Sequence, residues 1–397
     1  MIHLIRYLNL SNIGGIEFVF ALTPILMGFS IGGIPLSFLM WIILIIMVFL
    51  KNKHFKLKDF KPLTVFIVYW ALHQFLLLFI ADVNFNSIIA QLLYFAAVYF
   101  LYPSLSPQKL RGAMNWVAII SIAGLLYQWS EIMRGGFVHP LEIPGLEMPE
   151  DRLETMSFRP SSFYMEPAAY VSFMVCPLAL SLIDKKYIWS IVIILSIFLT
   201  TSTTGLLLSF IMLAVSLAAN NARISSGIIV VAIGLGLFYI LNNSELFGAG
   251  IEKIENTEAS TNVRLSQGPN VVNSMRPSEF VFGVPYSSAY NYCKAGRFTD
   301  VMYYGESVYM ATFWNMILLY GFVGLILYLF IYWKLFRMSR LIWPILLGVC
   351  VTLFSDPDFI YGSYVYKLIF MLVIATNDSQ IKAKSSHKSA QIIMNKY

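Results

Sequence analysis

Residues 188–219 read IWSIVIILSIFLTTSTTGLLLSFIMLAVSLAA, and this run decides how often the chain crosses an apolar layer. As a single helix it would be about 48 Å long, well beyond a hydrocarbon core of about 30 Å. The polar stretch TTSTTG, from Thr200 to Gly205, interrupts the run. Two helices of about 15 residues would each reach only about 22 Å, so their turn would lie below the surface of the layer. The run therefore predicts two short helices joined by a sunken turn.

The composition of the whole chain indicates the same apolar surrounding. Of the 397 residues, 58% are hydrophobic and only 12% are charged, whereas a soluble domain carries roughly 25% charged residues. Apolar runs of about 15 to 20 residues, which is the length that a helix needs to cross a bilayer, recur from end to end. We therefore expect an all-α polytopic membrane protein with about 12 transmembrane helices. The runs lie near 13–30, 33–50, 63–81, 87–102, 113–131, 166–183, 187–200, 204–219, 227–241, 307–333, 341–355 and 359–375.

Positive charge in the loops orients the chain. If residues 188–219 cross twice, 18 of the 27 Lys and Arg residues lie in inner loops and 8 in outer loops, with Lys367 inside a span. Inner loops of membrane proteins carry the excess of Lys and Arg, so we expect both termini in the cytoplasm. Residues 1–375 then form one integral membrane domain, and 376–397 form a basic cytoplasmic tail. The net charge of +6 does not indicate nucleic-acid binding, because the basic residues fall in short loops.

Two long outer loops, about 132–165 and 242–306, are where we expect function, because long loops on one face tend to carry it. The chain has no GxxxxGK[ST], GxGxxG, HExxH or GxSxG pattern, so we expect no cofactor and no metal. The acidic residues Asp356 and Asp358 lie in an outer turn, and we interpret them as structural partners of the mid-span Lys367. The alternative for Lys367 is a functional role, since ionisable groups inside a span are costly.

Residues 157–170, SFRPSSFYMEPAAY, lie where the first long loop ends and an apolar helix begins. Glu166-Pro167 suits the opening of a helix, because Pro fits the first helical position and a carboxylate meets the positive end of the helix dipole. Arg159 precedes Glu166 by seven residues. One interpretation is a helix cap with a local salt bridge. The other is a cation and an acid held for chemistry at the membrane surface.

The two long loops and their ends contain several arginines and tyrosines. Glu166 and Glu306 each lie where one of these loops meets an apolar run. Arg forms bidentate contacts with phosphate, and aromatic rings stack on sugar faces. A carboxylate where a loop meets a helix can take a proton from a hydroxyl. The pattern points to a lipid-linked sugar phosphate, and the alternative is a set of ordinary solvated charges. The residues concerned are Arg159, Glu166, Arg264, Arg276, Arg297, Tyr304, Glu306 and Tyr309.

Four segments carry a resemblance to a known family: RPSSFYMEPAAY, FLTTSTTGLLLSF, NVRLSQ followed by EFVFGVPYSS, and GESVYMATFWNMILLYGFVGLILYL. They resemble segments of the Wzy-type O-antigen and exopolysaccharide polymerases and, more distantly, of the O-antigen ligases. The resemblance covers roughly residues 60–375. Ligases usually place a His in the second long outer loop, and residues 242–306 contain none, which favours a polymerase.

The resemblance implies a GT-C-like membrane enzyme on the periplasmic face of the bacterial inner membrane. It would join undecaprenyl-diphosphate-linked oligosaccharide repeat units without a metal, alongside a separate chain-length regulator. On this basis we expect Arg159 and Arg264 to hold the diphosphate and Glu166 to act as base or hydroxyl orienter. Substrate-binding roles fall to Arg276, Arg297, Glu306, Tyr304 and Tyr309. The rivals are an O-antigen ligase that transfers the chain to lipid A core, a lipid-linked oligosaccharide flippase or transporter, and a structural scaffold.

Overall fold

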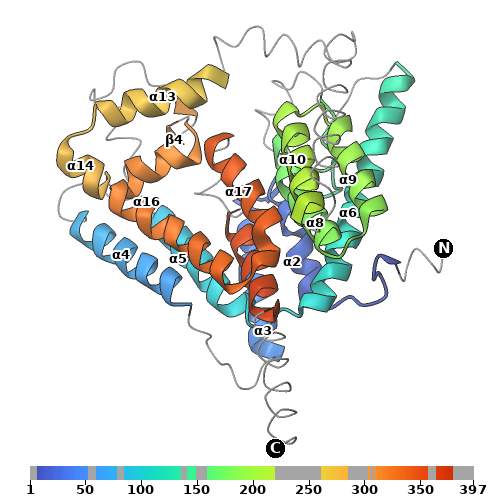
Figure 1. Cartoon of the computed structure of the whole chain (residues 1–397), viewed down its shortest axis with the longest axis horizontal. Coiled ribbons are helices and arrows are strands. Elements are labelled where there is room, and N and C mark those ends of the chain that lie inside the picture. Colours follow the sequence, from blue (N-terminus) through green and yellow to red (C-terminus); the bar gives the residue numbers. More distant parts are fainter. Residues whose placement is uncertain are drawn as a thin grey trace, which may run out of the picture.

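The computed structural model is mostly helical, and its helices pack side by side as a bundle (Figure 1). It describes residues 7–51, 60–77, 85–135, 141–148, 159–219, 261–284, 303–304, 307–308, 310–355 and 364–378. The α-helices are α2 (Gly15–Leu26), α3 (Leu36–Lys51), α4 (Lys61–Leu77), α5 (Phe85–Leu101), α6 (Pro107–Met133), α8 (Pro167–Ile183), α9 (Tyr187–Leu199), α10 (Thr203–Ala219), α13 (Thr261–Asn273), α14 (Pro277–Phe282), α16 (Thr312–Met338) and α17 (Trp343–Ser355). A 3-10 turn, η4 (Arg340–Ile342), precedes α17, and a further helix covers 364–378.

The described strands form two small antiparallel hairpins. In the first, β1 (Ser30–Ile31) pairs with β2 (Ile34–Pro35), and Ser30 also bridges to Glu147. In the second, β3 (Tyr303–Tyr304) pairs with β4 (Ser307–Val308). Neither hairpin is large enough to build a core, so packing between helices holds the fold together.

Two helices, α6 and α16, have the length and composition of membrane-crossing segments, with 27 residues each. The other apolar helices are shorter; α9, for example, has 13 residues. Large apolar side chains stay exposed on the outside of the bundle, among them Leu50, Ile188 and Ile326. Such an outer surface is unusual for a bundle surrounded by water.

The run 188–219 forms two helices, as its sequence predicts. α9 ends at Leu199, and α10 begins at Thr203. Thr201 has a left-handed backbone with φ 55°, and the Ser202 hydroxyl accepts a hydrogen bond from the Gly205 N–H at 3.3 Å. A Cβ at Gly205 would lie 2.4 Å from Val171 Cγ2, so the missing side chain lets α10 approach α8 closely. The polar turn therefore lies beside the first turns of α8.

Several predicted boundaries are wrong by a few residues. The span predicted at 13–30 ends as a helix at Leu26, because residues 30–35 form the first hairpin. The span predicted at 307–333 begins as a helix only at Thr312, since residues 307–308 pair in the second hairpin. The predicted outer loop 242–306 includes two helices, α13 and α14, which the sequence pattern did not predict. The predicted span 227–241 lies outside the described residues.

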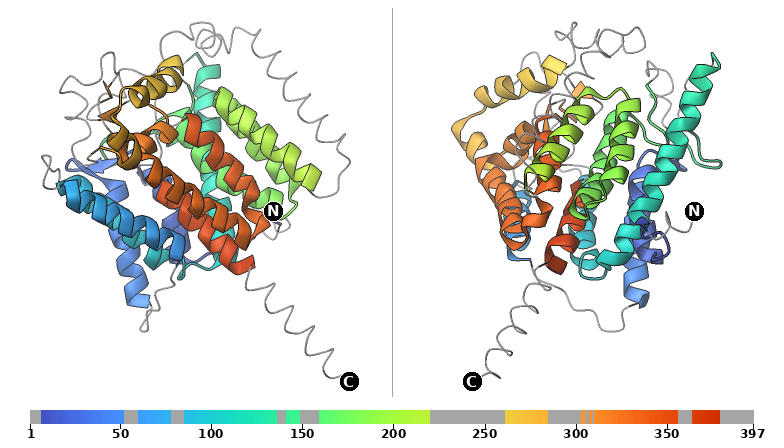
Figure 2. Two further views of the ribbon diagram at one scale, coloured as in Figure 1. Left: turned by 60° about the vertical axis from the view of Figure 1, so that its left-hand side comes forward. Right: turned by 45° about the vertical axis from the view of Figure 1, so that its right-hand side comes forward.

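A break inside α16 anchors α14 to the bundle. Gly321 has φ 68° and ψ −178°, and it sits against the backbone of Val281 and Phe282 so closely that a Cβ would clash. The freed carbonyl of Leu318 accepts the Val284 N–H at 2.7 Å. α13, which precedes α14 in the chain, lies across one end of the bundle (Figure 2). The break thus holds α14 against a long apolar helix.

The contacts of α8 define two ends of the bundle, which we name after its flanking acids. At the Glu166 end, Met165 packs against Gly28, just beyond the end of α2. At the Asp184 end, the acid at the close of α8 pairs with Arg111 in the first turns of α6. Figures 1 and 2 show α16 and the helix 364–378 finishing on this second side of the bundle.

Candidate functional site

The candidate site centres on Glu166, the residue that precedes α8. Its backbone is extended (φ −158°, ψ 160°), and Pro167 occupies the first helical position, as predicted. The Glu166 carbonyl accepts the Tyr170 N–H at 3.2 Å, but the carboxylate makes no capping hydrogen bond. Among the residues that the structure describes, the carboxylate has no ion pair either. The half-buried carboxylate therefore has neither a capping hydrogen bond nor an ion pair with a described residue.

Arg159 lies close enough to Glu166 for the two charges to interact. Burial lowers the pKa of the Arg159 guanidinium, and the Glu166 carboxylate opposes that lowering by Coulomb attraction. An arginine keeps its charge under such a shift, because its ordinary pKa lies above 12. Within the described part of the chain, the pair is not closed into a salt bridge. The local salt bridge of the first interpretation is thus absent from the described residues, and both charges can face a third group.

Gln128 on α6 clamps the turn that carries this pair. Its Oε1 accepts the backbone N–H groups of Ser161 at 3.0 Å and Ser162 at 2.7 Å. Its Nε2 donates to the Ser162 carbonyl at 3.4 Å. Ser162 has a left-handed backbone with φ 58°, which a non-glycine residue adopts only when its surroundings hold it there. Because these hydrogen bonds hold buried backbone groups, they fix the position of the backbone two and three residues after Arg159.

A second contact seats the same turn on α6. The Tyr164 hydroxyl shares a hydrogen bond with Ser121 Oγ at 3.0 Å, and Ser161 Oγ donates to the Tyr164 carbonyl at 2.8 Å. Gly124 lies between Ser121 and Gln128, and a Cβ there would come 2.5 Å from Ser162 Oγ. Ser121, Gly124 and Gln128 follow one face of the helix, since they are three and four residues apart. Together they form the seat of the segment 159–166.

Aromatic packing continues from this seat into the bundle. Tyr164 meets Tyr170 edge to face at 5.4 Å and stacks on Phe173 at 5.6 Å. Phe173 in turn contacts Tyr366 at 6.2 Å, and Tyr366 stacks on Phe20 at 4.7 Å. The candidate site is therefore supported by rigid packed rings and not by loop contacts alone.

The turn after α9 lies close to the seat of the site. The Trp129 ring N–H donates to the Leu199 carbonyl at 2.8 Å, which ties α9 to α6 next to Gln128. The Thr200 hydroxyl donates to the Ile197 carbonyl at 2.6 Å, as expected for a hydroxyl that bonds to helix backbone. The Thr201 Oγ1 atom is buried without a described partner.

The other predicted site residues are only partly described. Arg264 lies in α13 and Tyr304 in β3, where the structure gives the backbone alone. Arg276 is exposed before α14, and its backbone N–H donates to Glu279 Oε2 at 2.8 Å. Arg297, Glu306 and Tyr309 lie outside the described residues. The predicted approach of Arg264 to Arg159 therefore stays a prediction.

Lys367 is buried in the helix 364–378, with 4% of its surface exposed. Its ammonium is near enough to Cys176 on α8 for an electrostatic interaction. The proposed partners Asp356 and Asp358 lie outside the described residues, so their pairing with Lys367 stays a prediction.

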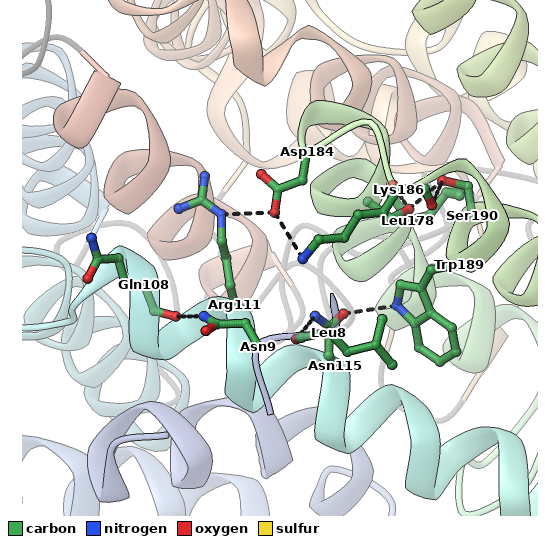
Figure 3. A network of polar contacts seen from close by, with 11 residues as sticks. Leu8, Asn9, Gln108, Arg111, Asn115, Leu178, Asp184, Lys186, Trp189 and Ser190 are labelled. Atoms are coloured by element: carbon green, nitrogen blue, oxygen red, sulfur yellow. Dashed lines mark hydrogen bonds and ion pairs between the residues drawn. The ribbon is translucent and has the colours of Figure 1, made fainter. Parts of the chain in front are cut away.

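The Asp184 end holds a polar network of a different kind (Figure 3). The Asp184 carboxylate pairs with Arg111 at 3.4 Å and with Lys186 at 3.7 Å. Nearby, Asn115 donates to the Leu8 carbonyl at 2.7 Å and accepts the Trp189 ring N–H at 2.9 Å. The contacts of Arg111 and Asn115 join α6 to the end of α8, to α9 and to the N-terminal segment, and the Asp184–Lys186 pair joins α8 to α9. The network is thus a latch between helices.

Sequence reasoning missed Gln128 and Ser121, although both position the candidate pair. The available signal was a polar set spaced S-x-x-G-x-x-x-Q on one face of an apolar helix. Comparisons gave no further guide: no protein-family model, curated protein or solved structure matches this chain.

Proposed function

We propose that this chain is an integral membrane polymerase that joins undecaprenyl-diphosphate-linked oligosaccharide repeat units on the periplasmic face of the bacterial inner membrane. The observation that carries the proposal is the Glu166 carboxylate, which is free of capping bonds and ion pairs among the described residues and lies beside Arg159. Acids at helix starts commonly accept hydrogen bonds from the helix. A carboxylate without such a bond, in a segment that Gln128 holds at Ser161 and Ser162, is suited to proton transfer.

The membrane setting is supported by the two long apolar helices and by the apolar side chains exposed around the bundle. A helix of 13 residues, such as α9, extends only about 20 Å, so its polar end stays below a surface of a layer about 30 Å thick. The turn at Thr200 would then lie within the outer half of the membrane, next to the start of α8. A lipid-anchored substrate could reach Glu166 and Arg159 from that depth.

The proposed reaction transfers the growing chain from its lipid diphosphate to an incoming repeat unit. A hydroxyl oxygen of the incoming sugar attacks the anomeric carbon, and the bond from that carbon to the diphosphate oxygen breaks. Glu166 takes the hydroxyl proton, while Arg159 neutralises charge that grows on the departing diphosphate. Since the donor is already activated, the step needs no nucleotide. Arg264 is proposed as a second diphosphate contact, because a diphosphate carries more charge than one cation balances.

The remaining predicted residues have supporting roles in this proposal. Arg276, Arg297 and Glu306 would contact the substrate from the second long loop, and Tyr304 and Tyr309 would stack on its sugars. A chain-length regulator is the expected protein partner. These assignments rest on residue type and on the resemblance described above.

The surface polysaccharide of a strain that lacks this gene tests the proposal. A lost polymerase leaves single repeat units on the lipid core. A lost ligase leaves an uncapped core and long chains on the lipid carrier, and a lost flippase leaves neither on the outer side. An unchanged polysaccharide ladder would contradict all three functions.

A further inference from the structure

The last turns of α16 carry aromatic and basic side chains on an exposed face. Phe330 stacks on Trp333 at 5.4 Å between ring centroids, and the Arg337 guanidinium lies over the Trp333 ring at 5.6 Å. Trp333 is 53% exposed although it is large and apolar. Lys334 and Arg337 are exposed, while Leu335 between them is fully buried. We call Phe330, Trp333, Lys334, Phe336, Arg337 and Arg340 the α16 stripe.

Two other cations near the Asp184 end differ from those of the stripe. Arg111 and Lys186 are already paired with Asp184. Lys334, Arg337 and Arg340 have no ion pair with any described residue. The nearby acid Asp378 is buried and accepts the Ser339 hydroxyl at 2.6 Å. The stripe thus keeps unbalanced positive charge beside exposed rings.

A cation at the end of a helix also interacts favourably with the helix dipole. That effect explains the charges of Lys334 and Arg337, but it does not explain exposed Phe330 and Trp333 next to them. Rings with a polar edge gather where apolar tails meet lipid headgroups, and long basic side chains reach from there to phosphates. Rings and cations on one helix face therefore match both parts of a lipid with a negatively charged headgroup.

We infer that the α16 stripe is a binding surface for an anionic phospholipid of the bilayer leaflet at the Asp184 end. Trp333 and Phe330 would lie against the glycerol and upper acyl chain, and Lys334, Arg337 and Arg340 would hold the headgroup phosphate. The inference rests on the proposed membrane setting, but not on glycosyl transfer. It adds a dependence on lipid composition that the proposed polymerase activity does not require.

Native mass spectrometry of the purified full-length protein in detergent can count bound lipid during titration with phosphatidylglycerol or phosphatidylcholine. We expect phosphatidylglycerol to bind more tightly. Each cation near such a surface contributes about fivefold in affinity, so Lys334→Gln with Arg337→Gln should weaken binding roughly 25-fold. Inorganic phosphate at millimolar concentration should not displace the lipid, because it lacks the acyl chains that the rings would contact.

The matched control is Lys51→Gln with Lys185→Gln, which removes two exposed cations without a described ring contact. We expect this control to keep wild-type affinity for phosphatidylglycerol. The variant Arg337→Lys keeps the charge and should retain most of the binding, which separates a lost contact from a misfolded protein. Equal binding of the two lipids, or equal losses in the stripe and control variants, would overturn the inference. Neither readout involves a glycan, so the polymerase proposal is tested separately.

Discussion

The two ends of α8 carry an acid each, and only one of the acids is engaged. Asp184 closes the helix and pairs with Arg111 and Lys186. Glu166 opens the helix, has Arg159 nearby, and makes neither a capping bond nor an ion pair with a described residue. An acid and an arginine thus form an ion pair at the Asp184 end, whereas at the Glu166 end the same two residue types lie near each other without an ion pair.

The helix dipole explains why the two acids need different neighbours. The carbonyl end of a helix is negative, so Asp184 needs cations to offset its own charge there. The amino end is positive, so Glu166 is stabilised without a partner. An acid that the helix itself stabilises can stay available to a substrate. Four changes probe this contrast, beginning with the largest expected effect.

Arg159→Ala should abolish long polysaccharide, because the departing diphosphate loses a cation at the site. Arg159→Lys should restore part of the chain length, since Lys keeps the charge without the planar fork that grips two oxygens. The control is Arg134→Ala, which removes an exposed arginine paired with Glu131 at 3.1 Å. Chain-length ladders at matched protein level give the readout. Normal ladders from Arg159→Ala would reduce this arginine to a loop charge.

Gln128→Met should shorten chains and lower the rate by roughly tenfold to a hundredfold, because a small displacement of a site can cost that much. Methionine has a similar size but cannot accept the Ser161 and Ser162 N–H groups. Gln91→Met is the control, since Gln91 is also buried, on α5. Similar losses in the two variants would point to a general packing defect.

Asp184→Asn should leave the chain-length ladder intact and lower stability by about 1 kcal/mol, because the paired groups are partly exposed. The midpoint of thermal unfolding in detergent measures the loss. Arg111→Met removes the other side of the pair and should give a similar shift. A latch that also served the reaction would lose chain length in both variants at full protein level.

Lys185→Gly should raise stability by about 0.5 to 1 kcal/mol, the smallest of these effects. Lys185 follows the end of α8 with φ 56°, its N–H bonds to the Leu182 carbonyl, and the Lys186 N–H bonds to the Ser181 carbonyl at 2.7 Å. Glycine suits this position in such a helix end. Lys185→Ala keeps a Cβ, so its unfolding midpoint should not rise. A rise of equal size in both variants would assign the effect to the lost charge.

Local features of the fold were predictable from the sequence. The start of α8 follows from Glu166-Pro167, and the division of 188–219 follows from its polar centre. Both depend on residues adjacent in the chain. The predicted end of 13–30 and the predicted start of 307–333 missed the hairpins, because short apolar strands and helix ends have similar composition.

Long-range contacts were not predictable in the same way. Gln128 contacts Ser162 across 34 positions, and Tyr69 donates to the Tyr320 carbonyl across 251. The break at Gly321 depends on the close approach of the Val281 backbone, which the sequence around Gly321 does not predict. The sequence thus predicts which acid and which arginine form the candidate pair, Glu166 and Arg159. Which acid is engaged depends on distant partners.

The most direct test compares Glu166→Gln with Asp184→Asn at matched protein level in the gene-deletion strain. Each change replaces a carboxylate at one end of α8 with an amide of the same shape. We expect single repeat units from Glu166→Gln, because an amide cannot take the hydroxyl proton, and a full polysaccharide ladder from Asp184→Asn. A full ladder from Glu166→Gln would contradict the account and would make Glu166 a helix-end residue without a part in the reaction.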